Sequence, residues 1–244
     1  MRDEAEYTHL FAGAVGEKAI GESSAFYLCL PGTAERIAQA VPDAKIIMIL
    51  REPAERAYSA HMLLVRDGRE TLSFEEGLSQ EEERRQQGFE PMWWYKELSL
   101  YYSQVKRYLE MFGTQQVKVL LYEELYAQPE QALRDVFAFL GVREDADINT
   151  SVRYNVAGLP KSRRLHTLLY KFIDSPNSLA KHIKPGLAWK AMGTLLLKPA
   201  PKMNPQTKAQ LKAYFAEDVA KLEDLLHQDL LCWQYREPSI AYKP

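Results

Sequence analysis

The stretch Lys45–His61, KIIMILREPAERAYSAH, decides the fold. It opens with five apolar residues, Ile46–Leu50, and a short apolar run rich in β-branched residues is typical of a strand buried on both faces of a parallel sheet. The run ends at Arg51, and Glu52-Pro53 then favours the start of a helix, because proline fits the first helical turn. The stretch therefore predicts a strand that leads directly into a helix over residues 54–65.

Arg51 and Ser59 occupy positions at which open α/β sheets bind ligands. Arg51 follows the carboxyl end of the predicted strand, and Ser59 comes eight residues later in the helix. Ligands of such sheets bind outside the carboxyl ends of the strands. We therefore expect Arg51 and Ser59 to hold a phosphate. The alternative is an arginine in a surface ion pair and a serine that merely belongs to a helix.

The same stretch resembles the 3′-phosphate-binding segment of sulfotransferases that use 3′-phosphoadenosine 5′-phosphosulfate. In that family a hydrophobic strand precedes Arg-(Asp/Glu)-Pro and a helix similar to Arg-Ala-Tyr-Ser. Here residues 50–59 read LREPAERAYS. The resemblance implies that Arg51 and Ser59 contact the 3′-phosphate of the cofactor.

A second strand is predicted over residues 116–122, QVKVLLY, and Tyr122-Glu123-Glu124-Leu125 stands at its carboxyl end. Sulfotransferases carry a similar Tyr-Glu-(Asp/Glu)-(Leu/Met) there, with the tyrosine against the adenine. An aromatic ring at a strand end can stack on a base, so the resemblance implies that role for Tyr122. A tyrosine half-buried under the following loop is the alternative.

Residues 155–163, NVAGLPKSR, resemble the loop that closes over the nucleotide in this family. In well-known members the loop carries a basic cluster that binds the 3′-phosphate, and here its basic and hydroxyl groups are Lys161, Ser162 and Arg163. The spacing departs from those members, so the side chain that reaches the phosphate stays open. An ordinary basic loop is the alternative reading.

Glu22 and His61 are the two candidates for the base that takes the acceptor's proton. Glu22 opens ESSAFY, which resembles Glu-Lys-(Ser/Thr)-Pro-x-Tyr of heparan-sulfate-type and bacterial sulfotransferases. In that branch the lysine lies near the transferred group. Ser23 and Ala25 replace the lysine and the proline here, which puts lysine assistance from this position in doubt. A lone Glu or His is more often structural.

One family feature is missing. Sulfotransferases begin with a strand and a Gly-Thr-Thr- or Gly-Ser-Thr-containing loop that cradles the 5′-phosphosulfate, as a nucleotide P-loop does. The glycines and lysine of residues 13–18 lack Walker spacing and follow no buried strand. We therefore expect the sequence to begin after that loop, as a fragment or as a protein without half of its cofactor site, and residues 1–244 alone to transfer sulfate slowly or not at all.

Composition narrows the function classes further. A net charge of −2 and a pI near 6.3 give no global attraction to nucleic acid, although residues 161–202 hold nine Lys or Arg against one acid. Cys29 and Cys232 make no disulfide framework, which fits a reducing, cytoplasmic location. No apolar run is long enough for a transmembrane helix, no signal peptide opens the sequence, and no metal-ligand spacing occurs.

The remaining pattern is mostly helical. We expect a short strand over residues 18–24, and helices in the following segments: Tyr7–Val15, Thr33–Ala40 capped by Thr33, Ser73–Gln87 on the surface, Trp93–Phe112, Pro129–Leu140 closed by Gly141, Arg164–Ile173, and a final helix from Asn204-Pro205 to Leu226. Residues 149–160 are expected to form a loop.

These observations predict a single α/β domain over residues 1–244, with a central parallel sheet flanked by helices, a P-loop-like sulfotransferase fold and a helical C-terminal part. The predicted activity is sulfuryl transfer from 3′-phosphoadenosine 5′-phosphosulfate, without a metal, to a hydroxyl or amine of a carbohydrate, lipid or small molecule. A non-catalytic member that binds adenosine 3′,5′-bisphosphate or an anionic partner is one alternative. A kinase-like nucleotide enzyme is another, disfavoured by the absent Walker lysine. The acceptor and the oligomeric state stay open.

Overall fold

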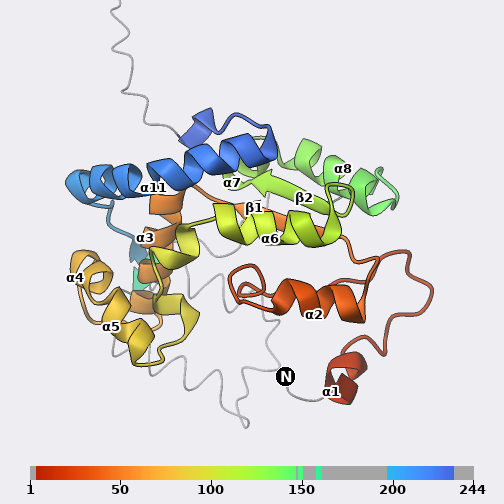
Figure 1. Cartoon of the computed structure of the whole chain (residues 1–244), viewed down its shortest axis with the longest axis horizontal. Helices are drawn as coiled ribbons and strands as arrows, with labels where there is room; N and C mark the ends of the chain where they lie inside the picture. The colour runs from red at the N-terminus through yellow and green to blue at the C-terminus, as the bar shows by residue number, and fades with distance from the viewer. Residues whose placement is uncertain (1–3, 147, 151–157, 161–196, 234–244) are drawn as a thin grey trace, which may run out of the picture. The chain divides into compact units, whose positions relative to one another are not determined.

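The chain folds into two compact units, one of which contains the two predicted strands. The computed structural model describes residues 4–146, 148–150, 158–160 and 197–233. We call residues 1–51, 102–152 and 227–244 the sheet unit, and residues 52–101 and 153–226 the helical unit. Figure 1 colours the elements of both units along the chain.

The sheet unit is built on a parallel strand pair, β1 (Ile46–Leu50) and β2 (Val117–Leu121), which lie side by side in Figure 1. Leu50 lies opposite Leu121 in their register. Both predicted strands and a parallel sheet are thereby confirmed. Leu50 is fully buried, but Ile49 is 54% exposed, so the prediction of burial on both faces is wrong. A uniformly apolar run cannot reveal this difference, because side chains of a strand alternate between its faces whatever their chemistry.

Helices surround this strand pair in the sheet unit. α2 and α6 pack against each other, and α6, α7 and α8 all contact β2. Gly141 closes α8 in the left-handed conformation, with φ of 74°, as predicted. The helical elements of the unit are α1 (Glu4–His9), α2 (Thr33–Ala40), α6 (Tyr102–Phe112), α7 (Tyr122–Ala127), α8 (Pro129–Leu140) and the 3-10 turn η4 (Leu231–Trp233).

Three predictions for the start of the chain are wrong. The helix expected over residues 7–15 is instead α1, which ends at His9 and is followed by turns at residues 10–13, because the glycines at 13 and 16 disfavour a continued helix. Residues 18–24 form an exposed loop instead of a strand, because their short apolar pattern finds no strand beside it among the described residues. Thr33 is the first residue of α2 rather than its cap. Gly32 holds the cap position with φ of 76°, and the hydroxyl of Thr33 accepts a hydrogen bond from Arg36.

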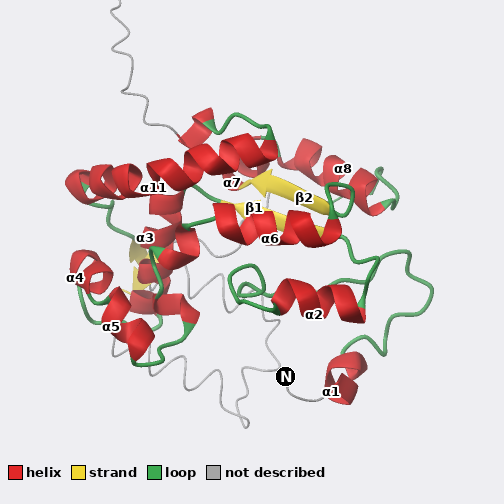
Figure 2. Cartoon of the chain, in the orientation of Figure 1, coloured by secondary structure: helices red, strands yellow, loops and turns green. Residues whose placement is uncertain are grey.

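The helical unit consists mostly of helices, which Figure 2 draws in red. These helices pack around one apolar core. Its elements are α3 (Pro53–Arg66), α4 (Phe74–Ser79), α5 (Glu81–Gln86), the 3-10 turns η1 (Pro91–Trp93) and η2 (Glu97–Ser99), the antiparallel strands β3 (Gly158–Pro160) and β4 (Leu197–Pro199), and α11 (Pro205–Leu226). The core lies largely between α3 and α11, and it consists of Ala54, Ala57, Leu64, Phe74, Tyr95, Met203, Leu211 and Phe215.

The helix predicted over residues 93–112 is broken, and only α6 remains of it. Carboxylates of other elements, the buried Glu81 and the half-buried Asp218, take the backbone N–H groups that a continuous helix would use. Glu81 accepts from Lys96 and Glu97 at 2.8 and 2.9 Å, and Asp218 accepts from Tyr101 at 2.7 Å. A helical pattern of aromatic residues does not reveal such long-range caps, because the carboxylates come from other elements.

The other helix predictions are confirmed or refined. The surface helix expected over residues 73–87 is two helices, α4 and α5, and Ser73 begins the first with a capping box to Glu76. α11 has the predicted bounds, and Asn204 caps its first turn. Residues 158–160, expected in a loop, form β3, and the helix predicted over 164–173 lies outside the described residues.

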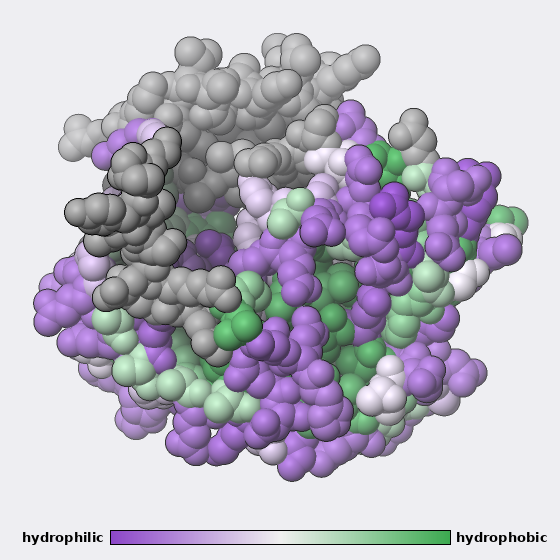
Figure 3. All heavy atoms as spheres, turned by 90° about the horizontal axis from the view of Figure 1, so that it is seen from above, coloured by the Kyte–Doolittle hydropathy of each residue, from purple (hydrophilic) through white to green (hydrophobic). Residues whose placement is uncertain are grey.

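No helix in the part of the chain that the structure describes is both long and apolar enough to cross a membrane. Hydrophilic residues dominate the described surface that faces the viewer in Figure 3.

Candidate cofactor site

The carboxyl ends of β1 and β2 bring two of the predicted cofactor residues together. Arg51 directly follows Leu50, and Tyr122 directly follows Leu121. Because the two leucines are register partners in a parallel pair, the residues that follow them emerge at the same edge of the sheet. The guanidinium carbon of Arg51 lies over the ring of Tyr122, 5.1 Å from its centroid.

Tyr122 belongs to the first turn of α7, and it is partly open to solvent. The side chain is 36% exposed, and its ring stacks on that of Tyr126, with centroids 5.6 Å apart and an interplanar angle of 28°. A cation and an aromatic ring therefore already share the surface of Tyr122. A base that stacks here has to fit beside them.

A buried tryptophan fixes α7 from the other end of the chain. The indole Nε1 of Trp233 donates to a carboxylate oxygen of Glu123 at 2.8 Å, and Trp233 is 4% exposed. A buried indole N–H needs an acceptor, and this one uses the residue next to Tyr122. Sequence reasoning gave neither Trp233 nor Tyr126 a role at the site. The tyrosine at helical spacing after Tyr122 was the available signal.

Ser59 lies on α3, in the helical unit, whereas Arg51 closes the first segment of the sheet unit. Ser59 is half-buried. That these two side chains hold one phosphate therefore stays a prediction.

The first backbone N–H groups of α3 already donate hydrogen bonds to its N-cap residue, Glu52. The Glu52 carboxylate accepts from the N–H groups of Ala54 and Glu55 at 3.3 and 2.8 Å. Burial raises the pKa of Glu52, although these two hydrogen bonds oppose the shift. A helix N-terminus favours anions, but here a carboxylate already satisfies those donors. Phosphate binding near this turn would thus depend on side chains such as Arg51.

His61 is enclosed in the core of the helical unit. It is 4% exposed, and the rings of Phe74 and Tyr95 lie 5.3 and 5.6 Å away. Its Nε2 lies 3.1 Å from the Leu72 carbonyl oxygen, so Nε2 must be the nitrogen that carries the hydrogen. Burial lowers the pKa of His61, which keeps the ring neutral. This geometry favours a packing role over that of a catalytic base, although the predicted role stays untested.

Glu22 is an exposed carboxylate in the sheet unit. It accepts a hydrogen bond from the Tyr7 hydroxyl at 3.2 Å, and a second one from Tyr27 raises the pKa of that phenol. The Tyr27 carbonyl in turn accepts from the hydroxyl of Tyr108, a buried residue of α6, at 2.6 Å. Of the two predicted bases, Glu22 is therefore the one that is exposed to solvent.

The other predicted elements of the site contribute no described contacts. Lys161, Ser162 and Arg163 lie outside the described residues. Residues 13–18 are exposed loop after α1, and no strand precedes them in the described part of the chain. Among the described residues, no group of three or more His, Cys, Asp or Glu side chains is placed to hold a metal ion.

Comparison with known proteins decides the family. The model of the family described as "Sulfotransferase family" matches residues 18–146, which include Glu22, Arg51, Ser59, His61 and Tyr122. The chain belongs to the sulfotransferase family. A crystal structure of a sulfotransferase from Alicyclobacillus acidocaldarius is similar with a TM-score of 0.73 and 42% sequence identity, over 96% of this chain and 75% of that one.

A second sulfotransferase is similar over a shorter stretch. The membrane-associated sulfotransferase kil1 of Dictyostelium discoideum is 35% identical over 57 residues, which are 23% of this chain and 12% of that protein. The sulfotransferase family identified from residues 50–59 and 122–125 is thus confirmed, and so is an α/β fold with parallel strands and helices.

Proposed function

We propose that this sulfotransferase transfers a sulfuryl group from 3′-phosphoadenosine 5′-phosphosulfate to a hydroxyl or amine acceptor. The observation that carries the proposal is the pairing of Arg51 with Tyr122 at the adjoining ends of β1 and β2. A guanidinium suits a phosphate and an aromatic ring suits a base, so together they match the two ends of an adenosine 3′-phosphate. We also propose that the sheet is P-loop-like and that the fold binds a nucleotide.

The cofactor, when bound, supplies the sulfuryl group, and the chain's own residues bind and orient. Arg51 and Ser59 would hold the 3′-phosphate, and Tyr122 would contact the adenine. Lys161, Ser162 and Arg163 would add further contacts to the phosphate. No metal takes part in this scheme.

Glu22 is the base in this proposal. It is exposed, so an acceptor can approach it, and the Tyr7 hydroxyl holds one of its oxygens. Glu22 would take the proton of the acceptor hydroxyl or amine during transfer. A general base must lie within hydrogen-bond reach of that proton, and a loop carboxylate open to solvent meets this condition more readily than the enclosed His61.

A transfer assay with labelled donor tests the proposal. The chain is incubated with the donor and a panel of carbohydrate, lipid and small phenolic or amine acceptors, and transferred label is separated and counted. We expect only slow labelling of at least one acceptor class, because residues 1–244 hold no recognisable phosphosulfate loop, and much less label with Arg51→Ala. Binding of adenosine 3′,5′-bisphosphate without any transfer would instead indicate the non-catalytic alternative. If the chain neither bound this nucleotide nor transferred label, the proposal would be wrong.

A further inference from the structure

Two exposed aromatic side chains of the sheet unit stand side by side. Tyr122 and Tyr126 are 36% and 47% exposed, and every other aromatic residue described in this unit is at least half-buried. They lie one turn apart on α7, and their rings stack with centroids 5.6 Å apart. The two most exposed aromatic residues of the described part of this unit therefore lie at one place, beside the carboxyl end of β2.

The ring of Tyr122 alone offers a base a restricted surface. The Arg51 guanidinium lies over it at 5.1 Å, and Tyr126 stacks against it. Tyr126 is the more exposed of the two residues, so more of its side chain is open to solvent. Aromatic side chains bind nucleic-acid bases by stacking, and every base has a π-face that can stack in this way.

The aromatic pair also sits on a fixed support. α7 packs against both β2 and α8. The hydrogen bond from the buried Trp233 to Glu123 holds its first turn. Ordering a flexible side chain on binding would cost free energy, so a platform that is already held gains affinity.

We propose that Tyr126 is a second base-binding residue, on whose exposed ring the purine of the nucleotide stacks, next to Tyr122 at the carboxyl end of β2. This inference rests on the proposed function, because it assumes that the nucleotide binds at these strand ends. It extends the cofactor site by one turn of α7.

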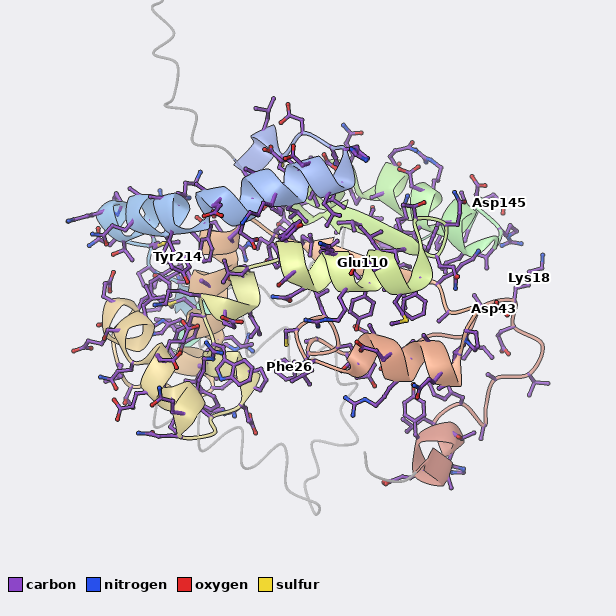
Figure 4. The ribbon with its side chains drawn as sticks, viewed as in Figure 1. Lys18, Phe26, Asp43, Glu110, Asp145 and Tyr214 are labelled. Carbon is purple, nitrogen blue, oxygen red and sulfur yellow. The ribbon has the colours of Figure 1, made fainter. Side chains whose placement is uncertain are left out.

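Calorimetric titration of the full chain with adenosine 3′,5′-bisphosphate tests the inference. Tyr126→Leu keeps apolar bulk on α7 but removes the aromatic face, and Tyr126→Phe keeps the face. The control is Tyr214→Leu, at an exposed tyrosine of α11 in the helical unit that is labelled in Figure 4. We expect the dissociation constant of Tyr126→Leu to be about tenfold larger, since loss of base–aromatic stacking has about this effect in alanine substitutions. Tyr126→Phe and Tyr214→Leu should stay within about twofold of the parent chain.

Each outcome separates the inference from the function on which it rests. If the parent chain binds the nucleotide and Tyr126→Leu binds equally well, the inference is wrong and the proposed cofactor stands. If Tyr126→Phe weakens binding as much as Tyr126→Leu, the hydroxyl rather than the ring acts, and base stacking on Tyr126 is refuted. If the parent chain does not bind the nucleotide, both are wrong. Melting temperatures of all variants show whether each remains folded.

Discussion

The guanidinium of Arg51 lies over the ring of Tyr122, 5.1 Å from the ring centroid to the guanidinium carbon. The two residues belong to different strand ends, and the register of β1 and β2 makes them neighbours. A cation–π contact at an exposed site contributes about 0.5–1 kcal/mol, enough to favour one orientation of the arginine fork. The contact thus orients the Arg51 guanidinium, which we propose binds the 3′-phosphate, before any ligand arrives.

Gly77→Ala should destabilise the helical unit. A Cβ at this position of α4 would lie 3.0 Å from Cε2 of Tyr95 and 3.6 Å from Cδ2 of His61. Alanine gains up to about 1 kcal/mol in a helix, whereas overpacking a core costs about 1–3 kcal/mol. We expect a net loss in the free energy of unfolding, measured by urea denaturation. Gly13→Ala, with open space around its Cβ, is the control, and equal stability of both variants would contradict the packing described.

Glu70→Gln should lower the free energy of unfolding strongly at neutral pH and only slightly at low pH. The buried Glu70 carboxylate pairs with Arg84 at 2.6 and 3.1 Å and accepts from the Tyr95 hydroxyl at 2.8 Å. Burial alone would raise the pKa of Glu70, but these contacts, Arg84 foremost, hold it at about 2 instead of 4.5. The unfolded chain therefore takes up the proton first, and the stabilisation present above pH 4.5 is lost as the pH falls toward 2.

The measurement is chemical denaturation of Glu70→Gln and the parent chain at a series of pH values. At neutral pH the variant should lose about 3–5 kcal/mol, because Arg84 stays buried without its partner charge. Glu90→Gln, in an exposed pair with Arg69, is the matched control and should cost less than about 1 kcal/mol. A difference between Glu70→Gln and the parent chain that does not shrink on acidification would count against the assigned pKa shift.

Glu22→Gln should affect catalysis and His61→Phe should affect stability. Glu22 is exposed, so Glu22→Gln should leave the melting temperature nearly unchanged and lower kcat about 100-fold or more, as loss of a general base does. His61→Phe keeps an aromatic ring but leaves the Leu72 carbonyl without its donor, so it should cost about 1–3 kcal/mol of stability. A stable His61→Phe with lost activity, beside an active Glu22→Gln, would reverse the assignment.

The sequence predicts the elements that short-range chemistry determines. The apolar runs of β1 and β2 are visible in the sequence, and so are the proline that starts α3 and the Asn204-Pro205 start of α11. Arg51 and Tyr122 could both be chosen as site residues because each directly follows an apolar run. Their contact requires the register of the strands, which no local pattern gives.

The predictions that fail are those that depend on distant groups. Glu81 and Asp218 end helical turns near residues 96–101 from other parts of the fold, which aromatic periodicity does not register. The predicted role of His61 as a base stays a prediction, but its burial likewise depends on distant groups, the rings of Phe74 and Tyr95. Trp233 reaches Glu123 across more than a hundred residues, so its role at the site is invisible in sequence.

The nucleotide site should prefer adenosine 3′,5′-bisphosphate to AMP. Arg51, Ser59 and residues 161–163 are all assigned to the 3′-phosphate, which AMP lacks. A charge-assisted hydrogen bond contributes about 1.5–3 kcal/mol, so the preference should be about tenfold or more. A thermal shift assay with both ligands at equal concentration is sufficient, and 2′-deoxy-AMP serves as a second ligand without the phosphate. Equal stabilisation by all of these ligands would indicate a site that recognises only the base and the 5′ group.

The most direct test of the account is the affinity of the full chain for adenosine 3′,5′-bisphosphate with and without the Arg51 guanidinium. Arg51→Ala should weaken binding about tenfold or more, Arg51→Lys should recover part of the loss because it keeps the charge without the planar fork, and all variants should melt alike. Arg134→Ala, at an arginine of α8 that bonds to Gln131, controls for loss of positive charge in the same unit. Unchanged affinity in a folded Arg51→Ala chain would contradict the central claim that Arg51 and Tyr122 mark the nucleotide site.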